Sequence, residues 1–252
     1  MRDIEHLHLQ ICEECNHAGP DHDIYLEELR TFMPHLHEAW LNPYKNQLRS
    51  LSLSFLDGWG PLPGYFDGMH LQFPRMERLT LGNFMVAHNN ALDWVLAQKS
   101  LKYLKLHKCR IVSHLRLDAA VLGDWDVRTH DWEALDAGEW DYPEDDKVFY
   151  YSGAWHQFFD RINEELPHLE DFEFISDVPE RHIRGDWDNS TKLSAARYIC
   201  FDEGLLPSRW IDPESFERQP DRHSETQDKD WVALENLRRT LERRRGSAGK
   251  KT

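Results

Sequence analysis

One spacing of apolar residues constrains the fold of this chain more than any other feature of its sequence. The pattern apolar-x-x-apolar-x-apolar occurs five times, as Ile4-Leu7-Leu9, Leu48-Leu51-Leu53, Met76-Leu79-Leu81, Leu101-Leu104-Leu106 and Leu169-Phe172-Phe174. In each copy the last two apolar residues are separated by one outward position, which is the period of a strand with one buried face. The pattern therefore predicts five similar strands whose apolar sides share one core.

Segments with helical periodicity lie between the predicted strands. Apolar residues recur at three- and four-residue steps in residues 24–33, 90–98 and 155–166, and we interpret these faces as core packing. Strand and helix in succession, with leucines at this spacing, are the signature of leucine-rich repeats. The intervals between copies are 44, 28, 25 and 68 residues, so the first and last need inserted segments. We expect one α/β domain over residues 1–252, an irregular leucine-rich-repeat-like solenoid with parallel strands.

Much of the formal net charge of −15 is concentrated in one stretch. Residues 121–146 hold ten acidic side chains and a single basic one, Arg128, together with Trp125, Trp132 and Trp140. Like charges favour a solvated segment, whereas the tryptophans favour docking at intervals. We therefore expect an acidic insertion that is partly docked on the body. The alternative is that it binds a basic partner.

The end of the chain has the opposite bias. Trp231, Leu234, Leu237 and Leu241 form one apolar helical face, and arginines follow them. This pattern predicts a C-terminal helix over 228–245, capped by Asp228 or Asp230, and a basic tail over 246–252. The simplest interpretation is a docked helix with a frayed end; a nuclear-localisation patch is the alternative.

Composition excludes several other classes of protein. Aromatic residues make up 12% of the chain, which argues against global disorder, and the acidic balance disfavours nucleic-acid binding. Apolar runs long enough to cross a membrane are absent, as is a secretory signal after Met1. Four cysteines are too scattered for a disulfide framework. We expect an intracellular protein, cytoplasmic or nuclear, without a membrane partner.

The repeats and the residues that follow them resemble the leucine-rich region of fungal F-box proteins. The resemblance runs through residues 46–53, 73–84, 92–96 and 101–111, and its more specific parts are Gly82-Asn83-Phe84 and Leu92-Asp93-Trp94. The block at 155–174, the Ala196-Arg197-Tyr198 segment and the closing helix are similar to the C-terminal half of that family.

That resemblance implies a substrate receptor of an SCF ubiquitin ligase. Members of the family usually carry an F-box ahead of the repeats, and this small helical segment binds the adaptor subunit of the ligase. We recognise no F-box here, because the sequence already has a repeat strand at Ile4. The resemblance therefore implies recognition of a protein substrate or peptide, with ligase subunits as partners only if a longer chain carries the F-box.

The outward positions of the five strands are the candidate binding residues. Alternation places them on the exposed face of the sheet, opposite the leucines. Such a mixed surface suits recognition of a protein or peptide without catalysis or a cofactor, although the same residues are also what a merely solvated face would show. The candidates are His6, His8, Ser50, Ser52, Arg78, Thr80, Tyr103, Lys105, Asp171 and Glu173.

The alternative function is a zinc-binding protein or metal-dependent enzyme that uses the N-terminal His and Cys residues. Cys12 and Cys15 form a C-x-x-C pair, with His17 and His22 close behind. Structural zinc needs two pairs of ligands, usually with about a dozen residues between them, and that spacer is missing. The pairs His6/His8 and His35/His37 would each put two imidazoles on one strand face, without a third ligand fixed by spacing. We therefore expect no resident metal.

Overall fold

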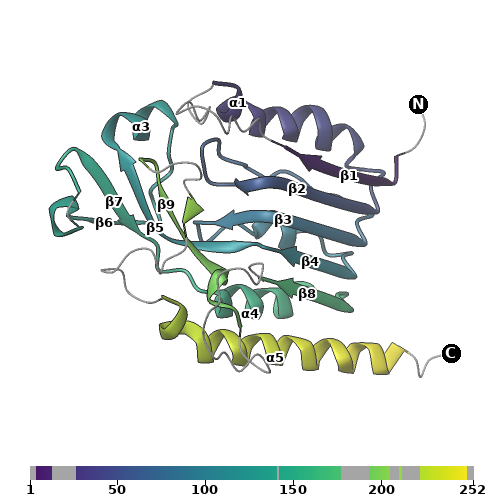
Figure 1. Cartoon of the computed structure of the whole chain (residues 1–252). Coiled ribbons are helices and arrows are strands. Elements are labelled where there is room, and N and C mark those ends of the chain that lie inside the picture. The colour runs from purple at the N-terminus through teal and green to yellow at the C-terminus, as the bar shows by residue number, and fades with distance from the viewer. Residues whose placement is uncertain are drawn as a thin grey trace.

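The computed structural model describes residues 4–12, 27–140, 142–176, 193–204, 210–211 and 222–248 (Figure 1). Within these residues the chain is a mixed α/β structure, with a ten-stranded, mostly parallel sheet and a long C-terminal helix. The expected α/β class, the parallel strands and the C-terminal helix are confirmed. No helix in the described ranges combines the length and apolar character needed to cross a membrane.

The five predicted strands lie side by side and parallel. Their order in the sheet follows the sequence: β1 (His6–Ile11), β2 (Ser50–Trp59), β3 (Arg78–Val86), β4 (Tyr103–His107) and β8 (Asp171–Ile175). Figure 1 shows them stacked from top to bottom of the view. Equivalent positions of the repeats are paired in register, so that Leu51 lies between Leu7 and Leu79. Each buried leucine of these rows contributes roughly 1.5–3 kcal/mol of transfer free energy.

One residue before each strand, side chains of opposite charge lie next to each other. Arg49 Nε is 3.5 Å from a carboxylate oxygen of Glu5, and Arg49 Nη1 is 2.9 Å from Glu77. Lys102 Nζ is 3.5 Å from Glu77, and the backbone N–H of Glu170 donates to the carbonyl of Lys102. Because these pairs are partly exposed, each is worth only about 0–1 kcal/mol. Because each of these residues immediately precedes a strand, their contacts nevertheless favour the observed register of the strands.

The other half of the sheet was not foreseen. It contains β5 (Arg110–Asp118), which pairs with the end of β3 and in parallel with β9 (Tyr198–Asp202). On the side opposite β9, β5 also pairs antiparallel with β7 (Asp146–Tyr150), and β7 pairs with β6 (Glu133–Leu135). A short strand, β10 (Trp210–Ile211), pairs with β9. In Figure 1 these strands fan out beyond the end of β3.

The helices occupy the edges and connections of the sheet. The helix α1 (Glu27–His35) continues into a π-helical turn, η2 (Leu36–Leu41), and a 3-10 turn, η3 (Asn42–Tyr44). The helices α2 (Asp93–Leu96) and α4 (Trp155–Glu165) bury the apolar stripes predicted for residues 90–98 and 155–166. Trp155 is fully buried and lies against Phe159 and Phe174.

The acidic insertion is built into the sheet instead of forming a loop on its surface. It includes most of α3 (Ala119–Asp124), the strand β6, the turn η4 (Ala137–Trp140) and the first residue of β7. Trp125 and Trp132 are only 6% and 9% exposed, so both dock this stretch on the core. The side chain of Trp140 lies outside the described residues. Asp146 is buried and forms an ion pair with Arg116, at a distance of 2.6 Å.

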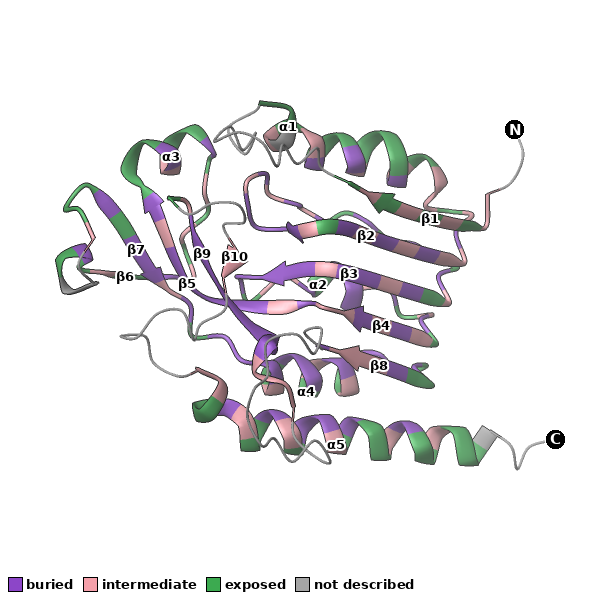
Figure 2. Cartoon of the chain, in the orientation of Figure 1, coloured by how far each residue is buried: buried purple, intermediate pink, exposed green. Residues whose placement is uncertain are grey.

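The C-terminal helix, α5 (Arg222–Ala248), begins six residues earlier and ends three residues later than the predicted 228–245. It runs alongside α4 (Figure 1), and its buried residues recur along the helix at three- and four-residue steps (Figure 2). The predicted tail therefore begins inside the helix, and residues 249–252 lie outside the described part. Arg244 donates to the carbonyls of Asn163 and Leu166, each at 2.9 Å, and so caps the end of α4. This part of the basic end is not frayed.

Asp230 is a buried ion-pair partner and not a helix cap, because α5 already begins at Arg222. Arg197 and Asp230 are both 0% exposed, and Arg197 Nε donates to Asp230 Oδ2 at 2.9 Å. The same oxygen accepts from Tyr198 Oη and Thr226 Oγ1, while Oδ1 accepts from the backbone N–H of His156. A single carboxylate thus joins α5 to α4 and to the start of β9.

Candidate functional site

The ten predicted binding residues lie on one face of the sheet. The pairing of the strands arranges them in two rows, His6–Ser50–Arg78–Tyr103–Asp171 and His8–Ser52–Thr80–Lys105–Glu173. Every member is exposed or half-buried, whereas the leucines between them on β2, β3 and β4 are fully buried. Figure 2 shows this alternation along β2 and β4 and at the start of β3. We call the two rows the outer face.

On β3, β4 and β8, the side chains of the outer face are bonded to one another. The guanidinium of Arg78 lies over the Tyr103 ring, 4.2 Å from its centroid. Tyr103 Oη donates to Glu173 Oε1 at 2.6 Å, and Lys105 Nζ is 2.9 Å from the other carboxylate oxygen. These contacts hold an aromatic ring and an arginine in a fixed arrangement near the centre of the sheet.

The protonation states of this group follow from its contacts. Burial and the hydrogen bond to Glu173 raise the pKa of Tyr103 to about 12. Hydrogen bonds from Tyr103 and Lys105 lower the pKa of Glu173. At neutral pH the phenol is therefore neutral and the carboxylate is charged. Such a group offers a partner fixed hydrogen-bonding and ionic contacts.

The part of the outer face on β1 and β2 has a different character. His6 and His8 are exposed, and Ser50 and Ser52 are half-buried. Imidazoles and hydroxyls both donate and accept hydrogen bonds, so this part can pair with backbone amides or polar side chains. The outer face thus changes from imidazole and hydroxyl groups at one edge to charged groups at the other.

The N-terminal metal hypothesis is only partly covered by the structure. Cys12 is exposed just after β1, whereas Cys15, His17 and His22 lie outside the described residues. The interpretation of His35 and His37 as neighbours on one strand face is wrong, because they lie at the end of α1 and in η2. Residues two apart on a helix do not share a face. His37 Nδ1 is instead 2.9 Å from the carbonyl oxygen of Asp67.

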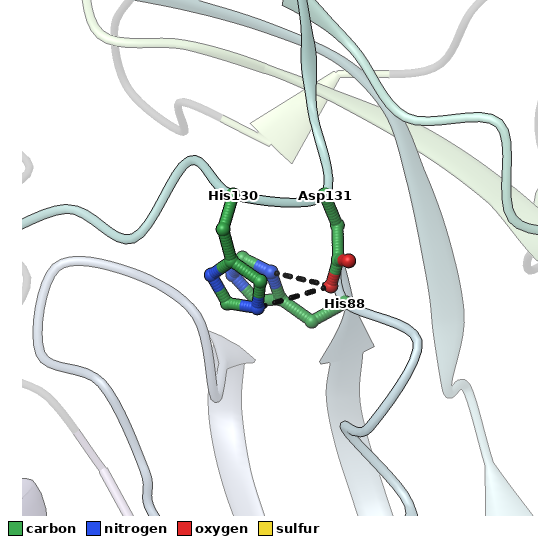
Figure 3. A group of neighbouring side chains, drawn as sticks. All are labelled: His88, His130 and Asp131. Carbon is green, nitrogen blue, oxygen red and sulfur yellow. Dashed lines mark hydrogen bonds and ion pairs between the residues drawn. The ribbon is translucent and has the colours of Figure 1, made fainter.

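A second cluster of titratable side chains was missed by sequence reasoning. His88 follows the end of β3, and His130 and Asp131 come just before β6 (Figure 3). His88 Nδ1 and His130 Nε2 are each 3.3 Å from Asp131 Oδ2. The two imidazoles are stacked, with centroids 4.9 Å apart. No local spacing could reveal this cluster, because its parts are more than 40 residues apart in the sequence.

Several contacts fix the His88 side of this cluster. The Trp132 ring stacks on His88 at 5.1 Å, and Asp131 accepts from the backbone and side-chain amides of Asn89. Burial and the nearby His130 lower the pKa of His88 to about 4. At neutral pH His88 is therefore a neutral imidazole with one nitrogen directed at a carboxylate. Two imidazoles and a carboxylate are ligands that suit transition-metal ions.

A cavity of about 380 Å³ lies away from both groups, beside residues 45–46, 70, 72–74 and 97–100. Its buried amide, Gln98, accepts from the backbone N–H of Phe73 and donates to the carbonyl of Leu71. These bonds tie two loops together and account for the buried amide structurally.

Comparisons with known proteins identified no relative of this chain. No family model, no curated protein and no solved structure matches the chain.

Proposed function

We propose that this chain is a recognition domain that binds a protein or peptide through the outer face and carries out no chemistry on it. The observation that supports this proposal most directly is the register of the sheet, which turns ten scattered residues into two continuous rows of accessible side chains. Parallel strands with in-register leucines are also how leucine-rich-repeat solenoids build their binding faces. We propose that the chain is an irregular member of that class.

The central Arg78–Tyr103 pair is the expected energetic centre of this interface. Tyrosine and arginine are enriched among the residues that dominate binding energies, particularly when they are held in place beforehand. Here Tyr103 is fixed from both sides, by the Arg78 guanidinium and by Glu173. A partner that covers this ring gains apolar area at little cost in side-chain entropy.

The resemblance to fungal F-box proteins leads to a more specific form of the proposal. In that form the bound protein is a ubiquitination substrate, the compartment is the cytoplasm or nucleus, and ligase subunits associate through an F-box in a longer chain. Detection of an SCF adaptor subunit with the full-length protein in its native cells tests this form. Its consistent absence from captures that retain the outer-face partner would contradict the ligase role and leave recognition itself standing.

The outer face is tested by replacing serine with arginine at two positions, one on the outer face and one away from it. Ser52→Arg places a bulky charge in the middle of the outer face, whereas Ser247→Arg places the same side chain on the exposed end of α5. Both variants and the wild type serve as bait in native lysate, and co-captured proteins are quantified. We expect Ser52→Arg to lose at least one partner that Ser247→Arg retains, with unchanged melting temperatures. Equal recovery by all three baits would overturn the proposal.

Once a partner is in hand, Tyr103 provides the sharper test. Tyr103→Ala removes the ring, and we expect the Kd to rise about 30-fold or more, the range of an interface hot spot. Tyr103→Phe keeps the ring and removes only the hydroxyl bonded to Glu173, so it should cost far less. If both variants bind as tightly as wild type, Tyr103 is not at the interface.

The acidic insertion remains a second candidate surface, but deletion does not test it cleanly. Asp131 and Asp146 are bonded to Asn89 and Arg116, so removing residues 124–146 would damage the sheet. Reversal of exposed charges is the better test. Glu144→Lys and Asp145→Lys change the charge where the side chains are exposed. Loss of partners in these variants, with normal capture by Ser52→Arg, would place the contact on the insertion.

A further inference from the structure

Among the residues that the structure describes, one cluster of metal-ligating side chains is not used by the recognition function. The donor atoms of His88, His130 and Asp131 all lie within 4.8 Å of one another (Figure 3). We propose that these three residues bind a divalent transition-metal ion of the Zn²⁺, Ni²⁺ or Cu²⁺ type. The ion would join the end of β3 to the acidic insertion.

The observed distances match the geometry of such a site. Metal bonds of about 2.0–2.1 Å to nitrogen and oxygen place tetrahedral ligand atoms about 3.3–3.4 Å apart. His88 Nδ1 and His130 Nε2 are each 3.3 Å from Asp131 Oδ2, so two of the three ligand-to-ligand distances already have that length. The third distance joins the two imidazole nitrogens and is at most 4.8 Å. A separation near that limit has to shorten before both nitrogens can bind one ion.

The residue free to make that adjustment is His130. Its side chain is 56% exposed, whereas that of His88 is 2% exposed and stacked on the Trp132 ring. A turn of the exposed ring about its side-chain bonds aims its nitrogen at the ion without disturbing the core. Solvent on the His130 side supplies water for the remaining coordination position.

Contacts behind the ligands fix the carboxylate. Asn89 donates its backbone N–H to Asp131 Oδ2 and its side-chain amide to Oδ1, both at 3.1 Å. Trp132 Nε1 donates to the carbonyl of Ala87, which ties the two ligand-bearing segments together. Such supporting bonds orient ligands and raise metal affinity.

The sequence segment that carries His130 and Asp131 is strongly acidic. Residues 121–146 contain ten acidic side chains and one basic residue, Arg128. Arg128 is engaged with the Tyr65 ring, 3.9 Å from its centroid, and with Asp67 at 3.6 Å. Two imidazole nitrogens and one oxygen select transition metals over Mg²⁺ and Ca²⁺, which prefer all-oxygen sites.

The test is a titration of purified chain, freed of metal by chelation, with Zn²⁺ by calorimetry and with Co²⁺ by visible absorption. We expect one ion per chain, no binding of Mg²⁺ at the same concentrations, and a rise in melting temperature with Zn²⁺. His130→Ala alters an exposed side chain and should weaken binding roughly tenfold or more. His168→Ala, on another exposed histidine, should change nothing.

One control distinguishes this site from the histidines of β1. The double variant His6→Ala/His8→Ala removes two exposed imidazoles from the outer face. The proposal requires this variant to bind Zn²⁺ as the wild type does. It is overturned if His130→Ala binds Zn²⁺ as tightly as the wild type, or if the wild type takes up none. Because the outer-face variants do not touch these ligands, failure here leaves the recognition proposal standing.

Discussion

Asp230 offers the clearest test of how the C-terminal helix is held. Its Oδ2 accepts from Arg197 Nε at 2.9 Å, from Tyr198 Oη at 3.0 Å and from Thr226 Oγ1 at 2.9 Å, and neither charged residue is exposed. Asp230→Asn keeps the size of the side chain but removes its charge. Arg197 then becomes a buried cation without its anion, which costs about 3–5 kcal/mol. A domain of this kind has about 5–15 kcal/mol in total, so the loss should be large.

The measurement is urea unfolding followed by tryptophan fluorescence, with Asp228→Asn as the matched control. Asp228 lies on the same helix and is exposed, so its replacement should change the free energy of unfolding by at most about 0.5 kcal/mol. The double variant Arg197→Met/Asp230→Leu removes both charges and should recover part of the loss, because the N–H of His156 and the hydroxyl of Tyr198 still lose their acceptor. A loss below about 1 kcal/mol for Asp230→Asn would refute the reasoning, since it would mean that the pair is hydrated or replaceable.

Two further perturbations follow from buried groups in the sheet. Burial and the nearby Arg222 lower the pKa of His114 to about 4, beside the Tyr150 ring. The unfolded chain, with a histidine pKa near 6.5, takes up the proton first, so stability falls as the pH drops below about 6.5, by about 2 kcal/mol at pH 5. Urea unfolding of His114→Gln at pH 7 and pH 5 should show a smaller difference than wild type, and an equal difference would contradict this assignment. Gly82→Ala would bring its new Cβ within 2.3 Å of Ser54 Oγ and 2.8 Å of Ser54 Cβ, at a cost of about 1–3 kcal/mol. Ser54→Gly should restore the melting temperature in the double variant, and a lack of rescue would show that the strain lies elsewhere.

The strands that the sequence could predict are those with one buried face. In β2, Leu51 and Leu53 alternate with half-buried serines, so the period is visible in the sequence itself. In β5, residues 111–115 are buried without interruption, and β9 is buried along its whole length. A strand covered on both faces has no alternation, and a short apolar run fits a helix equally well.

The same reasoning explains which candidate residues came together. The outer face could be predicted because parallel pairing in register converts a repeated spacing into rows, as for Ser52 and Thr80. His88 and Asp131 lie in different connecting segments, and only the folded chain brings them together. The sequence suggests a helix cap at Asp230 and does not reveal its ion pair, because its partner Arg197 is 33 residues away in the sequence. Pairings of this kind depend on tertiary structure and leave no periodic signal.

The charged residues that precede the strands limit how such a sheet can change in length. Reading across the sheet, Glu5, Arg49, Glu77 and Lys102 have charges of regularly alternating sign. Deletion of β2 alone would place Glu5 beside Glu77, two like charges directly opposite each other. Deletion of β2 together with β3 would place Glu5 beside Lys102 and keep every pair attractive. Gain or loss of two neighbouring strands therefore keeps opposite charges paired along this edge, whereas gain or loss of one strand does not.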